Sequence, residues 1–198
     1  MANPQSQDTF VPSENEGRIM ATDQRPSFPL GTSEKGRHVA VAFGLALLIF
    51  ALDQLTKWIV TVPLDLQLVR NIPVLPFFDL TWVENRGVSL GLLTAGTDTA
   101  RWLLVALTAA IATGVAVWIT RERSRPDALA LALVLGGALG NIVDRVRFGY
   151  VVDFADLHIG DFRPFLVFNV ADAAITIGVL LLFLRAFLTR KPKDETDA

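Results

Sequence analysis

The chain has 198 residues, of which 52% are hydrophobic and 19% charged, and its mean hydropathy is +0.43. This composition excludes an ordinary soluble domain and predicts an integral membrane protein, while the net charge of −2 is uninformative because the charges are segregated along the chain. Cysteine is absent, which excludes disulfides, a thiolate nucleophile and a cysteine-based metal site. The two histidines, His38 and His158, have no metal-ligand spacing, so we expect neither a metal nor another cofactor.

The chain order predicts one membrane domain between two polar tails. Residues 1–36 are rich in Pro, Ser, Gly, Asn and charge, which predicts a disordered tail and not a cleavable signal peptide. Four apolar segments follow at about 39–62, 102–120, 128–143 and 170–188, each near the roughly 20 residues that span a bilayer. The third must include residues up to 145 to reach across. We therefore expect a four-helix membrane domain over 37–190 and a short tail over 191–198.

The stretch between the first two apolar segments predicts a small β-element. Residues 64–68 and 80–84 both alternate apolar and polar side chains, which is the period of a half-buried strand. Pro73 and Pro76 interrupt the pattern between them. The predicted fold class is an α-helical integral membrane protein with four transmembrane helices and an extracytoplasmic β-element between helices one and two.

Lysine and arginine predict the orientation in the membrane. They precede the first segment, fill the link at 121–125 and follow the fourth segment at 190–193. With four spans these places share one face, which the positive-inside rule makes cytoplasmic, so both termini are expected there. Arg145, Arg147 and Arg163 lie on the other face, against this bias.

Several polar side chains gather at the extracytoplasmic ends of the segments. Asp53 and Lys57 are four residues apart and could pair, which taken alone favours a structural role. Asn141 stands three residues before Asp144 and four before Arg145, so the three share one side of a helix end. That group alone fits a headgroup anchor as well as a site. Within the same segment, Gly136 and Gly140 share a face and would let another helix approach closely.

Two further acids suggest catalysis. Asp153 closes the run 149–153, and Asp172 stands three residues after Asn169 at the mouth of the fourth apolar segment. A helix cap would explain Asp172 alone. It does not explain why both acids gather on one membrane face with Asn141 and Asp144. Two close carboxylates take opposite protonation states, which is the requirement for activating water against an amide.

A loop near the end of the β-element completes the pattern. Residues 85–91 contain Asn85 and Gly87, an arrangement typical of a turn or a re-entrant element and weak by itself. Taken in order, the blocks at 53–57, 85–91, 136–145, 151–154 and 168–172 resemble the lipoprotein signal peptidases, also called signal peptidase II, a family of bacterial membrane aspartyl proteases. The resemblance covers about 39–190. Ser89-Leu90 replaces a common Ala-Phe, and Ala173 follows Asp172 where Ser is frequent.

The resemblance implies an endopeptidase that removes the signal peptide from diacylglyceryl-modified prolipoproteins, cleaving before the lipidated cysteine. It implies a catalytic dyad of Asp153 and Asp172 at the extracytoplasmic face of the bacterial inner membrane. Expected partners are these precursors, membrane lipids and globomycin-type inhibitors, with no nucleic acid. The residues expected to support the site or bind substrate are Asp53, Lys57, Asn85, Gly87, Asn141, Asp144, Arg145 and Asn169.

Two other classes compete with the peptidase. An ion- or proton-coupled transporter would also carry acids in its helices, but usually near the bilayer midplane in repeated halves. Here the acids cluster at one face and no internal repeat is seen. A structural membrane subunit would use the same polar residues only for helix packing.

Overall fold

The computed structural model describes residues 34–87 and 98–188. The predicted C-terminal tail lies outside these residues, as do positions 1–33 of the predicted N-terminal tail and positions 88–91 of the predicted loop. Within the described residues, four helices are long and apolar enough to cross a membrane. They are α1 (Glu34–Thr61), α3 (Asp98–Arg121), α4 (Arg125–Phe148) and α5 (Val170–Leu188).

The four predicted spans are confirmed, and the third is longer than its apolar run. Helix α4 begins after Ser124, whose hydroxyl accepts a hydrogen bond from the Asp127 amide at 3.5 Å, and Pro126 lies in its first turn. It ends at Gly149, which has the left-handed φ of +85° that often terminates a helix. The helix therefore includes Asn141, as the span required.

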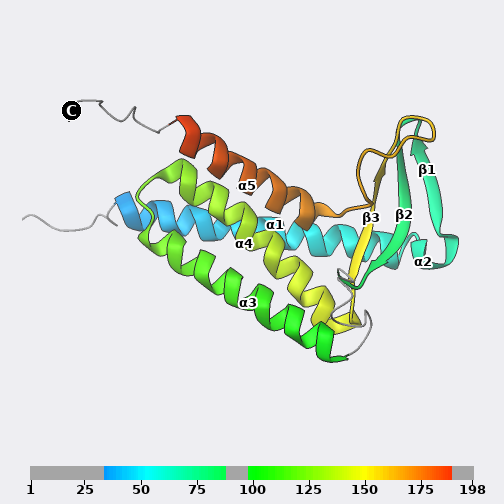
Figure 1. Ribbon diagram of the computed structural model, residues 1–198, viewed down its shortest axis with the longest axis horizontal. Helices are drawn as coiled ribbons and strands as arrows, with labels where there is room; N and C mark the ends of the chain where they lie inside the picture. The colour runs from blue at the N-terminus through cyan, green and yellow to red at the C-terminus, as the bar shows by residue number, and fades with distance from the viewer. Residues whose placement is uncertain (1–33, 88–97, 189–198) are drawn as a thin grey trace, which may run out of the picture. The chain divides into compact units, whose positions relative to one another are not determined.

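Helix α4 is the central helix of the four. It packs against α1, α3 and α5, and Figure 1 shows it between α3 and α5. Half of its most apolar window is buried, against 11–17% for the other spans, whose outer faces are left for lipid. Small residues allow this packing. A Cβ added at Gly136 would lie 2.5 Å from the carbonyl oxygen of Ala46 in α1, and one at Gly140 would meet Asp53 of the same helix.

The close approach predicted for Gly136 and Gly140 is therefore confirmed, and α1 is the helix that approaches. Two other glycines allow α4 and α5 to approach closely. A Cβ at Gly137 would meet the Ala171 carbonyl, and one at Gly178 would lie 2.6 Å from the Ala130 carbonyl. Backbone-to-backbone contact of this kind holds the helices at a fixed spacing, so the polar ends of α1, α4 and α5 are brought together.

The β-element is a three-stranded antiparallel sheet in the order β1-β2-β3 among the described residues. The strands are β1 (Asn71–Leu75), β2 (Phe78–Asn85) and β3 (Val151–Leu157). The predicted strand at 80–84 is confirmed within β2. Pro73 does not interrupt the sheet, because it lies in the edge strand β1, where the register shifts between Pro73 and Leu75. Strand β3, which follows α4, was not predicted.

The strand predicted at 64–68 is wrong. Asp65 adopts a left-handed conformation with φ 43° and ψ 42°, and the short helix α2 (Leu66–Val69) follows it. The turn buries Leu66 completely, in a cluster with Val60, Trp82 and Val152. The alternation of apolar and polar side chains comes from one buried leucine between exposed neighbours, and tertiary packing overrides the local strand preference.

Helix spacing gives a testable prediction. Replacing Gly136 with Ala should lower the midpoint of thermal unfolding in detergent, because the new methyl group has no room beside the α1 backbone; overpacking of this kind costs about 1–3 kcal/mol. The matched control is Gly114→Ala in α3, where nothing lies within 4 Å of the added Cβ. The control should keep or raise the midpoint, since Ala favours a helix. Equal effects at both positions would contradict the packing.

Candidate active site

Asp153 and Asp172 come together because the segment before α5 pairs with β3. Phe168 forms an isolated antiparallel bridge with Ala155. The Phe168 carbonyl accepts hydrogen bonds from the amides of Phe154 and Ala155 at 3.1 and 2.7 Å. This pairing begins one residue after Asp153 and ends one residue before α5 is capped. The first turn of α5 is therefore held beside the strand.

Asn169 connects the two carboxylates. Its side-chain Oδ1 accepts from the Asp172 backbone amide at 2.9 Å, and the Asn169 backbone amide donates to Asp172 Oδ2 at 3.3 Å. These reciprocal bonds form a capping box at the start of α5. The Nδ2 of the same Asn169 donates to Asp153 Oδ1 at 2.6 Å. Asp172 thus does take part in a helix cap, as its position suggested. The cap also fixes the side-chain amide of Asn169, which links Asp172 to Asp153.

The Asp153 carboxyl is buried with only 2% of the residue exposed. Asn85 Nδ2 donates to its Oδ2 at 3.0 Å. Burial, and secondly the negative charge of Asp172, raise the pKa of Asp153 to about 6, although hydrogen bonds from Asn85 and Asn169 and the charge of Lys57 act in the opposite direction. An unfolded Asp has a pKa of about 3.9, so ionisation of Asp153 destabilises the fold as the pH rises from about 4 to about 6.

Asn141 of α4 reaches the second carboxylate. Its Nδ2 donates to Asp172 Oδ1 at 2.8 Å. Its Oδ1 accepts from Lys57 Nζ at 3.1 Å and from Asn169 Nδ2 at 3.3 Å. Asn141 therefore connects the first turn of α5 to a charged group in α1.

That charged group is the centre of a buried triad. Lys57 Nζ lies 2.8 Å from Asp53 Oδ2 and 2.8 Å from Asp144 Oδ2, and all three side chains are at most 5% exposed. Asp53 Oδ1 also accepts from the Ala171 amide at 3.0 Å, and Asp144 Oδ2 from the Val152 amide at 3.1 Å. Each of these amides immediately precedes a dyad candidate. The pairing predicted for Asp53 and Lys57 is present, and it reaches both backbone segments of the site.

Gln54 is a member of this network that the sequence analysis missed. Its Nε2 donates to Asp144 Oδ1 at 3.1 Å and lies 3.3 Å from Asp53 Oδ2. The sequence signal was present, because a polar amide in an apolar segment adjoins Asp53. It was too weak to use, since nothing in the sequence showed that α4 lies against this face of α1.

Asn85 and Gly87 form a turn at the end of β2. The Gly87 amide donates to Asn85 Oδ1 at 3.0 Å, which leaves the Asn85 Nδ2 directed at Asp153. Gly87 has a φ of +92°, and a Cβ there would lie 2.6 Å from Leu104 Cδ1 in α3. Glycine is required at this position both for its conformation and for the close approach of α3.

Arg145 lies on α4 next to the triad. Its Nη1 donates to the Asn141 carbonyl at 3.3 Å. Its Nε is buried and finds no hydrogen-bond partner within residues 34–87 and 98–188. The neighbouring Asp144 pairs instead with Lys57 and with the Val152 amide. A buried guanidinium donor without a partner is costly, so it marks Arg145 as a candidate ligand-binding group.

A groove of about 490 Å³ opens beside Asp172. Its walls come from the β3–α5 connection and from the first turns of α5. Phe165 and Leu166 of that connection are 62% and 91% exposed. Apart from Asp172 and Thr176 the lining is apolar: Leu157, Pro164, Phe165, Leu166, Phe168, Ala173 and Ile177.

Comparison with known proteins decides the family. The family model described as Signal peptidase (SPase) II matches residues 45–188. The chain belongs to the signal peptidase II family. Two relatives called lipoprotein signal peptidase come from Sphingopyxis alaskensis and Rhizorhabdus wittichii. The first is 63% identical and covers 79% of this chain and 91% of its own, and the second is 60% identical and covers 81% and 93%.

Solved structures agree with this assignment. One described as a bacterial membrane enzyme aligns with a TM-score of 0.66 at 28% identity, covering 80% of this chain and 94% of its own. This signal peptidase II homologue is therefore a peptidase and a multi-pass membrane protein. The family assignment decides against the transporter and the structural subunit.

The buried triad can be tested by removing its cation. Lys57→Met should strongly destabilise the protein, by about 3–5 kcal/mol, because two buried carboxylates would lose their partner. The measurement is thermal or denaturant unfolding in detergent. The control is Arg86→Met, which breaks the 2.7 Å ion pair with Glu84 at an arginine that is 53% exposed. That variant should lose about 1 kcal/mol or less. A stable Lys57→Met protein would show that the triad does not hold the fold together.

Proposed function

We propose that this peptidase is an aspartic endopeptidase that removes the signal peptide from diacylglyceryl-modified prolipoproteins and cleaves before the lipidated cysteine. The observation that carries this proposal is that Asn169 is hydrogen-bonded to both Asp153 and Asp172 and so links the two carboxylates. The family supplies the peptidase activity and the name of its relatives supports the substrate class.

In this proposal the two aspartates take opposite roles. Asp153, whose pKa is raised to about 6, holds the proton. Asp172 stands at a helix N-terminus, where a negative charge is favourable, and acts as the base. Asp172 takes a proton from water, and the water oxygen attacks the carbonyl carbon before the cysteine. Asp153 gives its proton to the leaving nitrogen as the C–N bond breaks.

Neighbouring groups would hold the substrate in this arrangement. The unpaired Nε of Arg145 is a donor for a substrate carbonyl or for the negative charge that develops on its oxygen. Asn141, Asn85 and the Asp53–Lys57–Asp144 triad keep the aspartates in place without reacting themselves. Each of these assignments rests on the hydrogen bonds described above.

The groove beside Asp172 suits a lipid-bearing substrate. Its lining is almost wholly apolar, and it adjoins the carboxylate that would act at the scissile bond. Ile159 and Phe162 of the same connection are also largely exposed, at 72% and 66%. An exposed apolar surface outside the spanning helices is typical of a segment that rests in the membrane interface. We infer that acyl chains of the substrate lie along this surface.

The proposed location is the extracytoplasmic face of the bacterial inner membrane. The link between α3 and α4 carries Arg121, Arg123 and Arg125, and Figure 1 shows it at the ends of the helices away from the sheet. The positive-inside rule assigns that end to the cytoplasm. The dyad, the sheet and the apolar groove then face outward, where lipidated precursors would arrive, and both termini are cytoplasmic.

The dyad is tested by isosteric replacement. Asp153→Asn and Asp172→Asn should each abolish cleavage of a lipidated precursor by the purified protein, with the double variant little worse because the pair acts as a unit. Asp172→Asn retains an oxygen that can accept the capping bond, so the fold should persist.

The matched control is Asp156→Asn. Asp156 lies three residues along the same strand, is 1% exposed and pairs with Arg163 and Thr81 instead of the dyad. Its replacement should leave cleavage in place even where stability falls. Substantial turnover by either dyad variant would overturn the proposal.

The raised pKa gives a pH prediction. The dyad works with one proton, which Asp153 holds. Above about pH 6 Asp153 also ionises and can no longer act as the acid, so kcat/KM should fall by about tenfold per pH unit. Asn85 donates to the ionised Asp153 and lowers its pKa. Asn85→Ala should therefore move this limb to higher pH, whatever it does to the maximum rate. A limb that stays in place or moves to lower pH would argue against Asp153 as the acid.

A further inference from the structure

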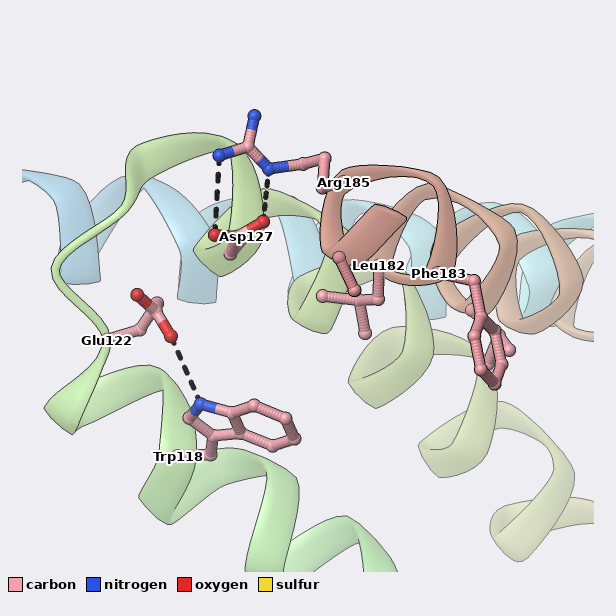
Figure 2. A pocket seen from close by; sticks show the side chains of 8 residues that line it. Trp118, Glu122, Asp127, Leu182, Phe183 and Arg185 are labelled. Atoms are coloured by element: carbon pink, nitrogen blue, oxygen red, sulfur yellow. Dashed lines mark hydrogen bonds and ion pairs between the residues drawn. The ribbon is translucent and has the colours of Figure 1, made fainter. Parts of the chain in front are cut away.

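An arginine from a neighbouring helix holds each end of α4. At the C-terminal end, Arg101 of α3 donates from Nε to the Arg145 carbonyl at 2.7 Å and from Nη2 to the Val146 carbonyl at 2.5 Å. At the other end, Arg185 of α5 binds the Asp127 carboxylate and donates from Nη2 to Ser124 Oγ at 3.0 Å. Figure 2 shows Arg185 over Asp127. These two residues line a cavity of about 430 Å³ that neither Asp153 nor Asp172 lines.

The contacts of Arg101 are suited to a helix end. The last carbonyls of a helix have no partner within the helix, and a positive charge there is favourable. The Arg145 carbonyl accepts both from Arg101 and from the Gly149 amide, the latter at 3.2 Å. A single guanidinium thus fixes two successive carbonyls of the last turn.

The two ends of α4 differ in what adjoins them. The turn held by Arg101 contains the Arg145 backbone and follows Asp144, whose carboxylate binds the Val152 amide. Five residues separate Arg145 from Val151, the start of β3, which is the strand that bears Asp153. The end held by Arg185 adjoins the connection from α3, which contains Glu122 hydrogen-bonded to Trp118 (Figure 2).

Helix α3 has a second contact with the surroundings of Asp153. One turn after Arg101, Leu104 lies against Gly87, and its Cδ1 is 2.6 Å from the place that a Cβ would take there. Gly87 closes the turn that directs Asn85 at Asp153. The first turns of α3 therefore touch both supports of Asp153, the end of β2 and the end of α4.

From these contacts we propose that Arg101 is a positioning residue for the dyad. It acts through the last turn of α4, so that Asp144 holds β3 and Asp153 stays at the geometry that Asn169 and Asn85 define. Arg101 touches neither carboxylate. The inference rests on the proposed function in that it treats Asp153 as a reacting group.

The test compares Arg101→Met with Arg185→Met in the full chain, purified in detergent. Both changes keep the aliphatic stem and remove every donor, and each removes an arginine from one end of the same helix. The measurements are kcat and KM for a lipidated precursor, the midpoint of thermal unfolding, and amide hydrogen exchange across residues 146–152. Arg101→Met should lower kcat by at least about tenfold, because small displacements of reacting groups are costly.

The same variant should speed exchange at 146–152 and leave KM within about threefold, since the lost contact concerns geometry at the bond that reacts. Arg101→Lys restores one donor and the charge, so its kcat should lie between those of Arg101→Met and the natural protein. Arg185→Met should lower the unfolding midpoint while kcat and exchange at 146–152 stay unchanged. If Arg101→Met does not fold, Arg101→Lys takes its place in the comparison.

Two results would overturn the inference. The first is an Arg101→Met variant whose kcat equals that of the natural protein. The second is an Arg185→Met variant that loses as much kcat as Arg101→Met when the two variants lose the same stability. Failure of the proposed function is seen separately, as cleavage that survives Asp153→Asn. In that case hydrogen exchange decides on the Arg101 contact: faster exchange at 146–152 supports it, and unchanged exchange overturns it.

Discussion

The structure depends on one buried ammonium group. Lys57 lies between Asp53 and Asp144 and also donates to Asn141, so a single side chain of α1 is bonded three times at the centre of the helices. Removing the Lys57 ammonium would leave the two carboxylates unpaired, and removing the carboxylates would leave the ammonium unpaired, in surroundings that cannot solvate a charge. Asp53 Oδ1, which Lys57 does not contact, accepts from the Ala171 amide of α5, and Asp144 Oδ2 accepts from the Val152 amide of β3 in addition to binding Lys57. The triad therefore ties α1 to α4 and also holds the backbone segments that carry Asp153 and Asp172.

Polar groups at membrane depth are tolerated here because nearly all of them are partnered. Asn169 and Asn141 use both their donor and acceptor atoms, and the first turn of α5 is closed by its own capping box. A network in which every member depends on its neighbours has few alternative arrangements. Next to this network, the Nε of Arg145 is buried without a partner in the described chain. An otherwise complete network with one open donor is the arrangement that a substrate carbonyl would complete.

Helix α4 makes contact with every part of this arrangement. Its glycines bring α1 and α5 to backbone contact, its polar residues meet the triad and Asp172, and its two ends are held by Arg101 and Arg185. The outer faces of α1, α3 and α5 stay apolar and exposed, which is what a lipid environment requires. The sheet has a buried apolar cluster that includes Trp82, Val152 and Phe154, and it carries Asp153 to a place that α4 and α5 define.

The sequence by itself determined the four spans and the set of polar residues at one end of them, and its loop charges predict that the opposite ends are cytoplasmic. These features follow from local rules: apolar length, loop charge and the three- or four-residue spacing of a helix face. It also determined the family, through five blocks in a fixed order. A strand was wrongly predicted at 64–68, because alternation over five residues does not distinguish a strand from a turn that buries only Leu66.

Only the tertiary structure decided which of these polar residues meet. Nothing local relates Asn85 to Asp153 or Lys57 to Asp144, since each pair is joined by contacts between segments far apart in the chain. Strand β3, the role of Gln54 and the grip of Arg101 on α4 share this property. Strand β3 and Arg101 bond through backbone amides and carbonyls, which every residue carries, so side-chain identity gives no sign of these contacts. Gln54 bonds to carboxylates of α1 and α4, and only the packing of these two helices shows that it can reach Asp144. Such contacts are set by how the helices pack, and that is decided by the whole fold.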